Sequence, residues 1–234
     1  MQPKTNATVS RIGRSSTVLP STSFTKAGLY SVALLPLAFL AGCMLDETGY
    51  TSADYYYLNP YKNLSTIGSV ALVEPNNNSV YPQMSAEVTE SLFQAVQKKQ
   101  LFAVRVVRQN DLAWRNLQIT SDSTYTLQQL HAMRQTLYCN AVLVGTITSY
   151  QPYPYMSIGL RLKLVDLADG RLLWAIEQIW DTADKETEKR IGKYFRAQMR
   201  SGHAPVPEQL VAVSPIHFMK FVAYEVAETL RHGR

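Results

Sequence analysis

The chain has 234 residues, of which 46% are hydrophobic, and its 23 lysines and arginines outnumber its 18 acidic residues to give a formal net charge of +5. Four of these cations and none of the acidic residues lie in residues 1–42. Residues 43–234 therefore carry 19 basic and 18 acidic side chains, and this near balance removes the basic charge as an argument for nucleic-acid binding. Their length suits one domain with a normal hydrophobic core.

Residues 1–42 contain the three parts of a bacterial lipoprotein leader in the right order. Basic residues come first, Ala27–Leu40 follows as an apolar stretch too short to span a bilayer, and Ala41-Gly42 precedes Cys43. In such a leader a peptidase cleaves after Gly42, once the Cys43 thiol carries a diacylglyceryl group. An ordinary secretory signal and an accidental cysteine are the alternatives. We expect a signal peptide over residues 1–42 and a lipid on Cys43.

The residue after Cys43 indicates which membrane holds the anchor. Met44 stands where an aspartate would favour retention in the inner membrane, so we expect the periplasmic face of the outer membrane. Once Cys43 is acylated, Cys139 is the only thiol left, and no intramolecular disulfide is possible. Cys139 precedes an apolar run, which favours the role of a small buried hydrophobe over that of a reactive thiol.

Residues 43–64 are interpreted as a lipidated tether. They are polar and aromatic without periodicity, and they include the run Tyr55-Tyr56-Tyr57. We expect this segment to dock on the folded part of the chain, and the alternative is that its tyrosines anchor at a lipid headgroup layer. Residues 65–234 are predicted to form a single α/β domain with a carboxy-terminal helical extension.

The first part of this domain is predicted to alternate strands and helices. Residues 66–73 form a mostly apolar run typical of a strand, and residues 74–78 contain a proline and three asparagines that indicate a loop. Hydrophobic residues repeat at helical spacing over residues 84–99. Residues 102–107 then alternate as in a strand.

The next elements follow a polar, irregular segment. Thr126 is a favourable N-cap for a helix that runs to Tyr138, and Asn140 is expected to close it. Residues 141–150 are a strand in which alternate residues face opposite sides of the sheet. Residues 156–166 alternate in the same way.

The last strands are predicted to form a hairpin. Asp169-Gly170 separates the strand that ends at residue 166 from a further strand over residues 171–180, and this dipeptide is a strong turn signal. Asp181 is expected to cap a charged helix over residues 183–200, and Ser214-Pro215 is expected to open a final helix. The order β-α-β-α-β-β-β predicts an α/β fold in which a mixed sheet of about five strands packs with helices.

Two runs carry a resemblance to a known family. AVLVGTI over residues 141–147 and LRLKLVDLADGRLLW over residues 160–174 resemble the curli-secretion-channel lipoprotein family, in which an apolar strand with a glycine, a turn and an L-R-x-V-D-x-x-T-G-E-x-L-W pattern recur in this order. A similar arrangement occurs in lipoprotein activators of penicillin-binding proteins and in the amino-terminal domain of the Tol-system propeller protein. The resemblance implies their shared fold.

The chain departs from the curli-type pattern where pore-lining hairpins would be inserted. A strand that crosses a membrane needs about 9–11 alternating residues. Only residues 150–155 separate the third predicted strand from the fourth. After the fifth strand the run is charged on most faces, with Glu186–Arg190 and Lys185–Glu188 as opposite-sign neighbours at helical spacing. We therefore do not expect the pore-forming part of that family's activity.

Sequence motifs for catalysis are missing. There is no Gly-rich phosphate loop, no G-x-S-x-G and no H-E-x-x-H. The chain has four histidines, His131, His203, His217 and His232. Only His217 lies near the start of an amphipathic helix, and it has no cysteine or carboxylate at the spacing of metal ligands. We therefore expect no enzymatic activity, no cofactor and no metal site.

Several conspicuous residues have simple structural interpretations. Asp166 is expected to cap the hairpin turn, Gly170 to supply a positive φ and Trp174 to fill the core. Glu74 and Asp166 each end a predicted strand and could form a carboxylate pair at one sheet edge, although loop capping is the commoner role.

The charged helix is the candidate interaction surface. Ile191, Tyr194, Phe195 and Met199 form a narrow apolar seam, and the plainer interpretation is that this seam only docks the helix on the sheet. The sharper interpretation is that the basic residues stay outward to meet an acidic partner or lipid headgroups. These basic residues are Lys189, Lys193, Arg196 and Arg200.

Two classes of function remain. The first is a non-enzymatic lipoprotein, anchored to the outer membrane, that acts in the periplasm as an interaction or assembly module of an envelope machine. The alternative is a ring-forming structural subunit of a secretion or export accessory complex, which would make the chain a homo-oligomer. Both place the chain at a membrane through the lipid on Cys43, with an envelope protein as partner and no nucleic acid.

Overall fold

The computed structural model describes residues 55–120, 123–200 and 214–231, without the side chains of Met199 and Arg200. These residues belong to one compact unit, Thr48–Arg234. The expected leader, its cleavage site after Gly42 and the lipid-attachment residue Cys43 lie outside the described residues. So do His203 and His232.

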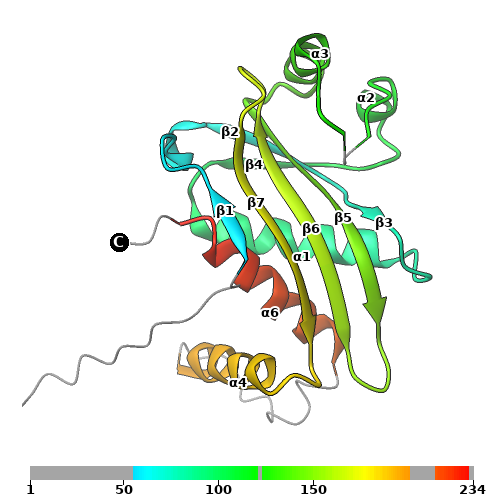
Figure 1. The fold of residues 1–234 in the computed structure, drawn as a ribbon, viewed down its shortest axis with the longest axis vertical. Helices are drawn as coiled ribbons and strands as arrows, with labels where there is room; N and C mark the ends of the chain where they lie inside the picture. Colours follow the sequence, from blue (N-terminus) through cyan, green and yellow to red (C-terminus); the bar gives the residue numbers. More distant parts are fainter. Residues whose placement is uncertain (1–54, 121–122, 201–213, 232–234) are drawn as a thin grey trace, which may run out of the picture. The chain divides into compact units, whose positions relative to one another are not determined.

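A seven-stranded mixed sheet forms the centre of the domain (Figure 1). Its strand order is β1-β7-β6-β5-β2-β4, and β3 pairs with β5 off this path. β2 is parallel to β4 and β5, whereas β5, β6 and β7 form an antiparallel meander and β1 is antiparallel to β7. The strands are β1 Tyr56–Leu58, β2 Ser69–Val73, β3 Asn76–Asn77, β4 Ala103–Val107, β5 Ala141–Gln151, β6 Ser157–Asp166 and β7 Leu172–Asp181.

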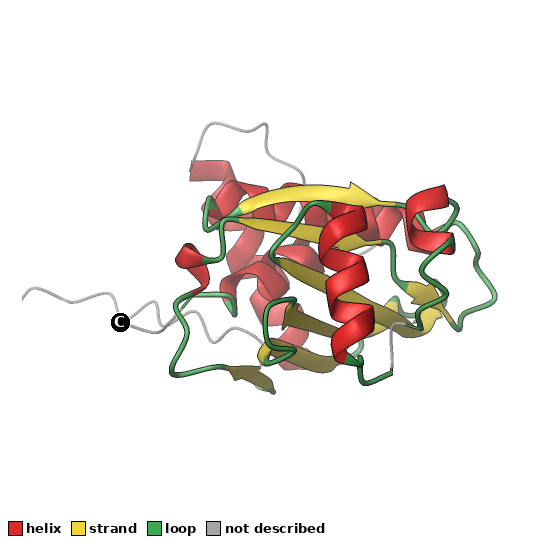
Figure 2. Cartoon of the chain, turned by 90° about the horizontal axis from the view of Figure 1, so that it is seen from above, coloured by secondary structure: helices red, strands yellow, loops and turns green. Residues whose placement is uncertain are grey.

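Helices lie on both sides of this sheet, as the view from above shows (Figure 2). Residues of α1, α4 and α6 pack with one face, and residues of α2 and α3 pack with the other. The helices are η1 Leu64–Thr66, α1 Met84–Lys99, α2 Leu112–Arg115, α3 Leu127–Leu137, α4 Lys185–Arg200 and α6 Pro215–Glu228. The predicted α/β fold with a mixed sheet and carboxy-terminal helices is confirmed.

Alternation along the strands divides the core into two clusters. In β5, Leu143 and Ile147 join the cluster under α1 and α6, whereas Val142 and Val144 join the cluster beside α3. Each fully buried aliphatic side chain of this kind contributes about 1.5–3 kcal/mol of transfer free energy. The period of two that the sequence shows in β5 therefore fixes which helices each residue meets.

Two strands are additional to the five that the sequence predicts. β1 lies inside the segment that was expected to dock, and it pairs with β7 in the register Tyr56↔Ile176. Asn59 holds its end, because its side chain donates to the carbonyl of Leu172 at 3.1 Å. β3 falls in the run that was predicted to be entirely loop. Its two asparagines pair with Thr146 and Ile147 of β5, so the pairing uses backbone groups that composition does not reveal.

Helix ends confirm one predicted cap and correct two others. Thr126 forms a capping box with Gln129 at the start of α3. That helix ends at Tyr138, whose φ of 50° is left-handed, and not at Asn140. α4 begins after Asp184, whose carboxylate accepts from the Thr187 amide at 2.9 Å and whose pKa this bond lowers. Asp181 was the predicted cap, but it accepts from Ala183 in the preceding turn.

The β6–β7 turn has the predicted chemistry. Gly170 has a φ of +72°, and the Asp166 carboxylate accepts from the Ala168 amide at 2.8 Å. Trp174 is fully buried, and its Nε1 donates to Thr229 Oγ1 at 2.9 Å. The roles expected for Asp166, Gly170 and Trp174 are confirmed.

Glu74 and Asp166 do not meet. Ala141 pairs both with Val70 in the first part of β2 and with Asp166 at the end of β6, so Asp166 lies beside the start of β2. Glu74 follows the other end of β2 and accepts from the Gln109 amide at 3.0 Å. Because β6 runs antiparallel to β5, the two carboxylates are at opposite ends of the sheet. The carboxylate-pair hypothesis is wrong.

The segments where the curli-type hairpins would lie are short or helical. Residues 152–156 join β5 to β6, and β7 leads into α4. Within the described part of the chain, none of the helices has the length and hydropathy required to cross a membrane.

Candidate functional site

The two sides of α4 have different environments. Ile191 and Phe195 are buried in the core cluster, and Tyr194 packs against Phe221 of α6 with ring centroids 5.9 Å apart. The Phe195 ring meets His217 edge-on at 5.8 Å. These three residues therefore dock the helix as the plainer interpretation expected, but their ring contacts are with α6 rather than with the sheet.

Three of the predicted basic residues lie on the exposed side of α4. Lys189, Lys193 and Arg196 are all exposed, and the Arg200 side chain lies outside the described part. Lys189 Nζ donates to Glu186 Oε1 at 2.6 Å, and this bond raises the pKa of Lys189. The structure thus brings together an outward basic surface, in which Glu186 offsets one of the charges.

A buried ion pair fixes α4 to α6. Arg190 does not pair with Glu186 as its spacing predicted. Its Nε lies 3.0 Å from Oε1 of Glu225, whose side chain is 0% exposed. The other carboxylate oxygen of Glu225 accepts from Trp180 Nε1 at 2.7 Å. One acidic residue of α6 therefore connects the charged helix to β7.

A cleft lies between α1, α4 and α6. Its volume is about 470 Å³. Helix α1 contributes Lys98 and Lys99, α6 contributes Lys220 and Arg231 follows its end. The other lining residues are Ser91, Gln94, Ala95, Tyr194, Gln198, Tyr224 and Glu228. Four cations and one carboxylate thus surround a single hollow.

Tyrosine rings and one ion pair form part of this cleft's lining. Tyr194 and Tyr224 have ring centroids 4.8 Å apart. The Lys99 ammonium pairs with Glu228 and lies 5.1 Å from the centre of the Tyr224 ring, which leaves the Lys99 side chain only 8% exposed. Burial raises the pKa of both tyrosines, and the charge of Glu228 adds to the effect at Tyr224. Both rings are therefore neutral near pH 7.

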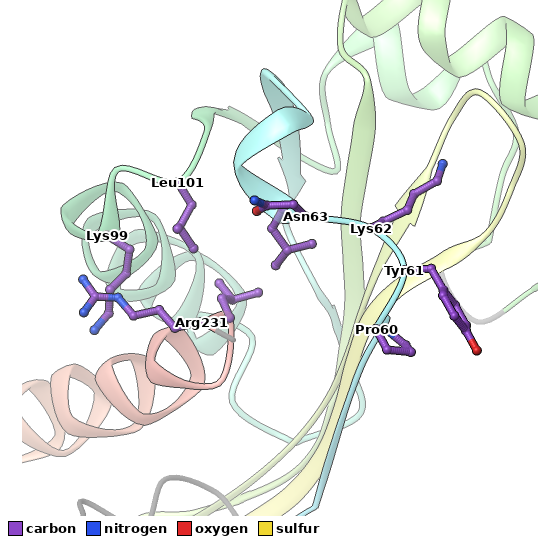
Figure 3. Close-up of a pocket in the computed structure, with 9 residues that line it drawn as sticks. Pro60, Tyr61, Lys62, Asn63, Lys99, Leu101 and Arg231 are labelled. Carbon is purple, nitrogen blue, oxygen red and sulfur yellow. The ribbon is translucent and has the colours of Figure 1, made fainter. Parts of the chain in front are cut away.

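A second hollow, of about 800 Å³, adjoins the first (Figure 3). Lys99 and Arg231 line both hollows, and the segment Pro60–Leu64 lies across from them in this one. Lys62 points away toward the β6–β7 turn, where its ammonium binds Asp166 and Asp169.

These bonds shift the pKa values of both partners in the turn. The hydrogen bond to Asp166, followed by that to Asp169, raises the pKa of Lys62. Burial would raise the pKa of Asp169, but the bonds from Lys62 and from the Arg171 amide lower it overall. The two carboxylates therefore neutralise the Lys62 ammonium, which adds little positive charge to the second hollow.

The remaining candidate groups have structural environments. Cys139 is buried beside α3, and burial raises the pKa of its thiol, as expected for a core hydrophobe. Among the described residues, no group of three or more histidines, cysteines and carboxylates is placed to hold a metal ion.

The sequence did not reveal the cleft. Its cations come from residues 98–99, 220 and 231, and no short motif joins them. The last turn of α1 carries a Lys-Lys pair, but basic residues near a helix carboxy terminus are common for electrostatic reasons alone. Only the packing of α1 beside α6 brings these charges together.

Comparison with known proteins gives a weak likeness of fold. No protein-family model and no curated protein matches the sequence. Among solved structures, the PelC dodecamer from Paraburkholderia phytofirmans is 12% identical with a TM-score of 0.41, over 73% of this chain and 95% of that one. Lipoprotein GNA1162 from Neisseria meningitidis is 16% identical with a TM-score of 0.41, over 57% and 96%. LpoB from E. coli is 17% identical with a TM-score of 0.38, over 76% and 89%. At these values no activity, location or partner follows from the likeness.

Proposed function

We propose that this chain is a non-enzymatic lipoprotein of the bacterial outer membrane, anchored through Cys43, whose folded domain binds a protein of an envelope machine in the periplasm. The observation that supports the anchor is the ordered leader, which ends in Leu40-Ala41-Gly42-Cys43. The observation that supports a binding role is the outward basic face of α4.

The spacing between anchor and domain limits where the partner can be. Tyr56, the first residue of β1, lies thirteen positions after Cys43. A fully extended chain spans at most about 3.3–3.6 Å per residue, so the domain begins within about 45 Å of the lipid. The partner would therefore be a membrane protein or a complex close to the membrane surface.

The anchor is tested by Cys43→Ser. Acyl chains contribute about 0.8 kcal/mol per buried methylene to membrane anchoring. Without the Cys43 thiol, the leader should stay uncleaved and the chain should stay unacylated. Cells grown with radioactive palmitate should label the wild-type chain and not the variant. Palmitate label retained in Cys43→Ser would refute the lipid anchor.

The binding surface is tested by reversing two exposed charges on α4. Lys193→Glu with Arg196→Glu should alter stability little, because substitutions at exposed positions usually change it by less than about 0.5 kcal/mol. In-cell crosslinking followed by mass spectrometry should then lose one partner that the wild type captures.

The matched control places the same charge change on the opposite side of the sheet. Arg115→Glu with Arg134→Glu reverses two exposed charges on α2 and α3. This control should keep the wild-type crosslinking pattern. If the α4 variant also keeps it, with the melting temperature held, α4 is only part of the fold.

A further inference from the structure

The cleft between α1, α4 and α6 has an excess of positive charge. Lys99 and Glu228 neutralise each other, which leaves Lys98, Lys220 and Arg231. All three are exposed, and among the described residues none of them has a carboxylate partner. Three cations around one hollow without a counter-charge are a feature that the docking of α4 does not explain.

The form of the cleft strengthens the field of these charges. Its walls are helices packed on the apolar core, and walls of low dielectric concentrate the potential of cations inside a cleft. Lys98 lies in the last turn of α1, and Arg231 follows the carboxy-terminal end of α6. An anionic ligand that enters the cleft would therefore meet these cations, although Lys220 also lines a neighbouring hollow with Glu87 and Glu90.

The rest of the lining fits a ligand with one charged and one apolar part. Tyr194, Tyr224 and Ala95 supply apolar surface, and the Ser91 hydroxyl adds a neutral polar group. Binding sites for small molecules commonly combine an apolar lining with a few polar groups that orient the ligand. Lysine and arginine are the usual protein ligands of phosphate, arginine as a fork of donors and lysine as a point charge.

We propose that this cleft binds a ligand that contains phosphate, with Lys98, Lys220 and Arg231 as the cations that line the cleft and the Tyr194–Tyr224 pair beneath the remainder of the molecule. A phosphate monoester carries a charge of about −1.5 to −2 at pH 7, which matches most of the unpaired positive charge. The phosphate could belong to a soluble ester or to a lipid headgroup. The site is separate from the outward face of α4 and does not require the lipid on Cys43.

Binding is measured on residues 43–234 with Cys43→Ser, a chain that retains the whole compact unit. Pyrophosphate is titrated by calorimetry at low ionic strength. In parallel, the chain is sedimented with vesicles of phosphatidylcholine alone or of phosphatidylcholine with phosphatidylglycerol. Saturable binding of pyrophosphate indicates a site for a soluble ester. Binding only to vesicles that contain phosphatidylglycerol indicates a lipid headgroup.

Two double variants decide where the phosphate binds. Lys98→Glu with Lys220→Glu should weaken binding at least tenfold, because charge-assisted hydrogen bonds contribute about 1.5–3 kcal/mol and 1.4 kcal/mol is a factor of ten. Arg115→Glu with Arg134→Glu changes the net charge equally on the opposite side of the sheet and should leave the affinity within about twofold. Lys98→Arg with Lys220→Arg should retain binding.

Two results would overturn the proposal. One is a wild-type chain that binds neither pyrophosphate nor the anionic vesicles. The other is an equal loss of affinity in both charge-reversal variants, which would assign any binding to net charge alone. Neither result bears on acylation, since palmitate labelling of Cys43 is measured separately.

Discussion

Replacing Arg190 by methionine should destabilise the domain more than any other single charge removal on α4. Methionine keeps an unbranched apolar stem but removes the cation that lies 3.0 Å from Glu225. The Glu225 carboxylate is 0% exposed, so it would stay buried with the Trp180 indole as a neutral donor. Removing one partner of a buried ion pair typically costs about 3–5 kcal/mol, because the other charge is left without compensation.

The structure places the expected cost at the lower end of that range. Arg190 is 13% exposed, so water can reach the site once the guanidinium is gone. We therefore expect about 3 kcal/mol. A domain of this size loses about 2–4 °C of melting temperature per kcal/mol, which corresponds to a fall of about 6–12 °C.

Urea unfolding followed by tryptophan fluorescence measures this change. A buried carboxyl group without its cation takes up a proton more readily in the folded state than in the unfolded state. Stability then falls as pH rises, so the deficit of Arg190→Met should be larger at pH 8 than at pH 5. Adding Glu225→Gln removes the orphaned charge and should recover a large part of the loss.

Lys193→Met is the matched control, since it removes an exposed charge from the same helix. Its effect should stay within about 0.5 kcal/mol. If Arg190→Met costs no more than this control, the pair does not hold α4 to α6. If the loss of unfolding free energy in Arg190→Met does not change with pH, Glu225 is not a buried carboxylate without a cation in that variant.

Three further predictions concern the turn, the cleft and the assembly state. Gly170→Val should lower the free energy of unfolding by about 1–3 kcal/mol, because φ is +72° and the new Cβ would lie 2.8 Å from Leu130 Cδ1, and an unchanged melting temperature would contradict this turn geometry. The control Gly192→Ala in α4, whose new Cβ has its nearest contact at 3.6 Å, should instead raise the free energy of unfolding by about 0.5–1 kcal/mol. Tyr194 and Tyr224 have raised pKa values in the folded chain, so they keep their protons above about pH 10, where the phenols of the unfolded chain ionise. The free energy of unfolding should therefore fall above that pH. In urea titrations from pH 9 to 11, Tyr194→Phe with Tyr224→Phe should make this fall shallower. Native mass spectrometry of residues 43–234 with Cys43→Ser should give a monomer, whereas a discrete ring would favour the structural-subunit alternative.

The long elements followed directly from local physical signals. Helix α1 begins and ends at Met84 and Lys99 as its hydrophobic period predicts, and α3 begins after Thr126 because the cap and its Gln129 partner are adjacent in sequence. The β6–β7 turn was equally accessible, since Asp169-Gly170 specifies a positive φ locally. Each of these features depends on residues only a few positions apart.

The sequence-based predictions were wrong or incomplete where residues far apart in the chain determine which groups pair. Arg190 has Glu186 at ideal helical spacing, yet it pairs with Glu225, because that carboxylate is buried whereas Glu186 remains in water with Lys189 nearby. A solvated pair contributes little, at most about 1 kcal/mol, so the buried carboxylate determines the pairing. β1 and β3 were missed for a related reason, since short strands at the margin of a sheet are held by backbone pairing that side-chain patterns do not encode.

The same reasoning explains why α4 can present two surfaces at once. A helix docked by one apolar seam has its remaining residues divided between the flank beside its neighbours and the face in solvent. Tyr194 and Gln198 lie on the flank and line the cleft with α1 and α6, while Lys193 and Arg196 lie on the solvent side. Because the Arg190–Glu225 pair fixes α4 to α6, breaking that pair should disturb the cleft as well as the stability. Arg190→Met should therefore weaken pyrophosphate binding even though Arg190 does not line the cleft, and unchanged affinity in a destabilised variant would show that the cleft forms from α1 and α6 alone.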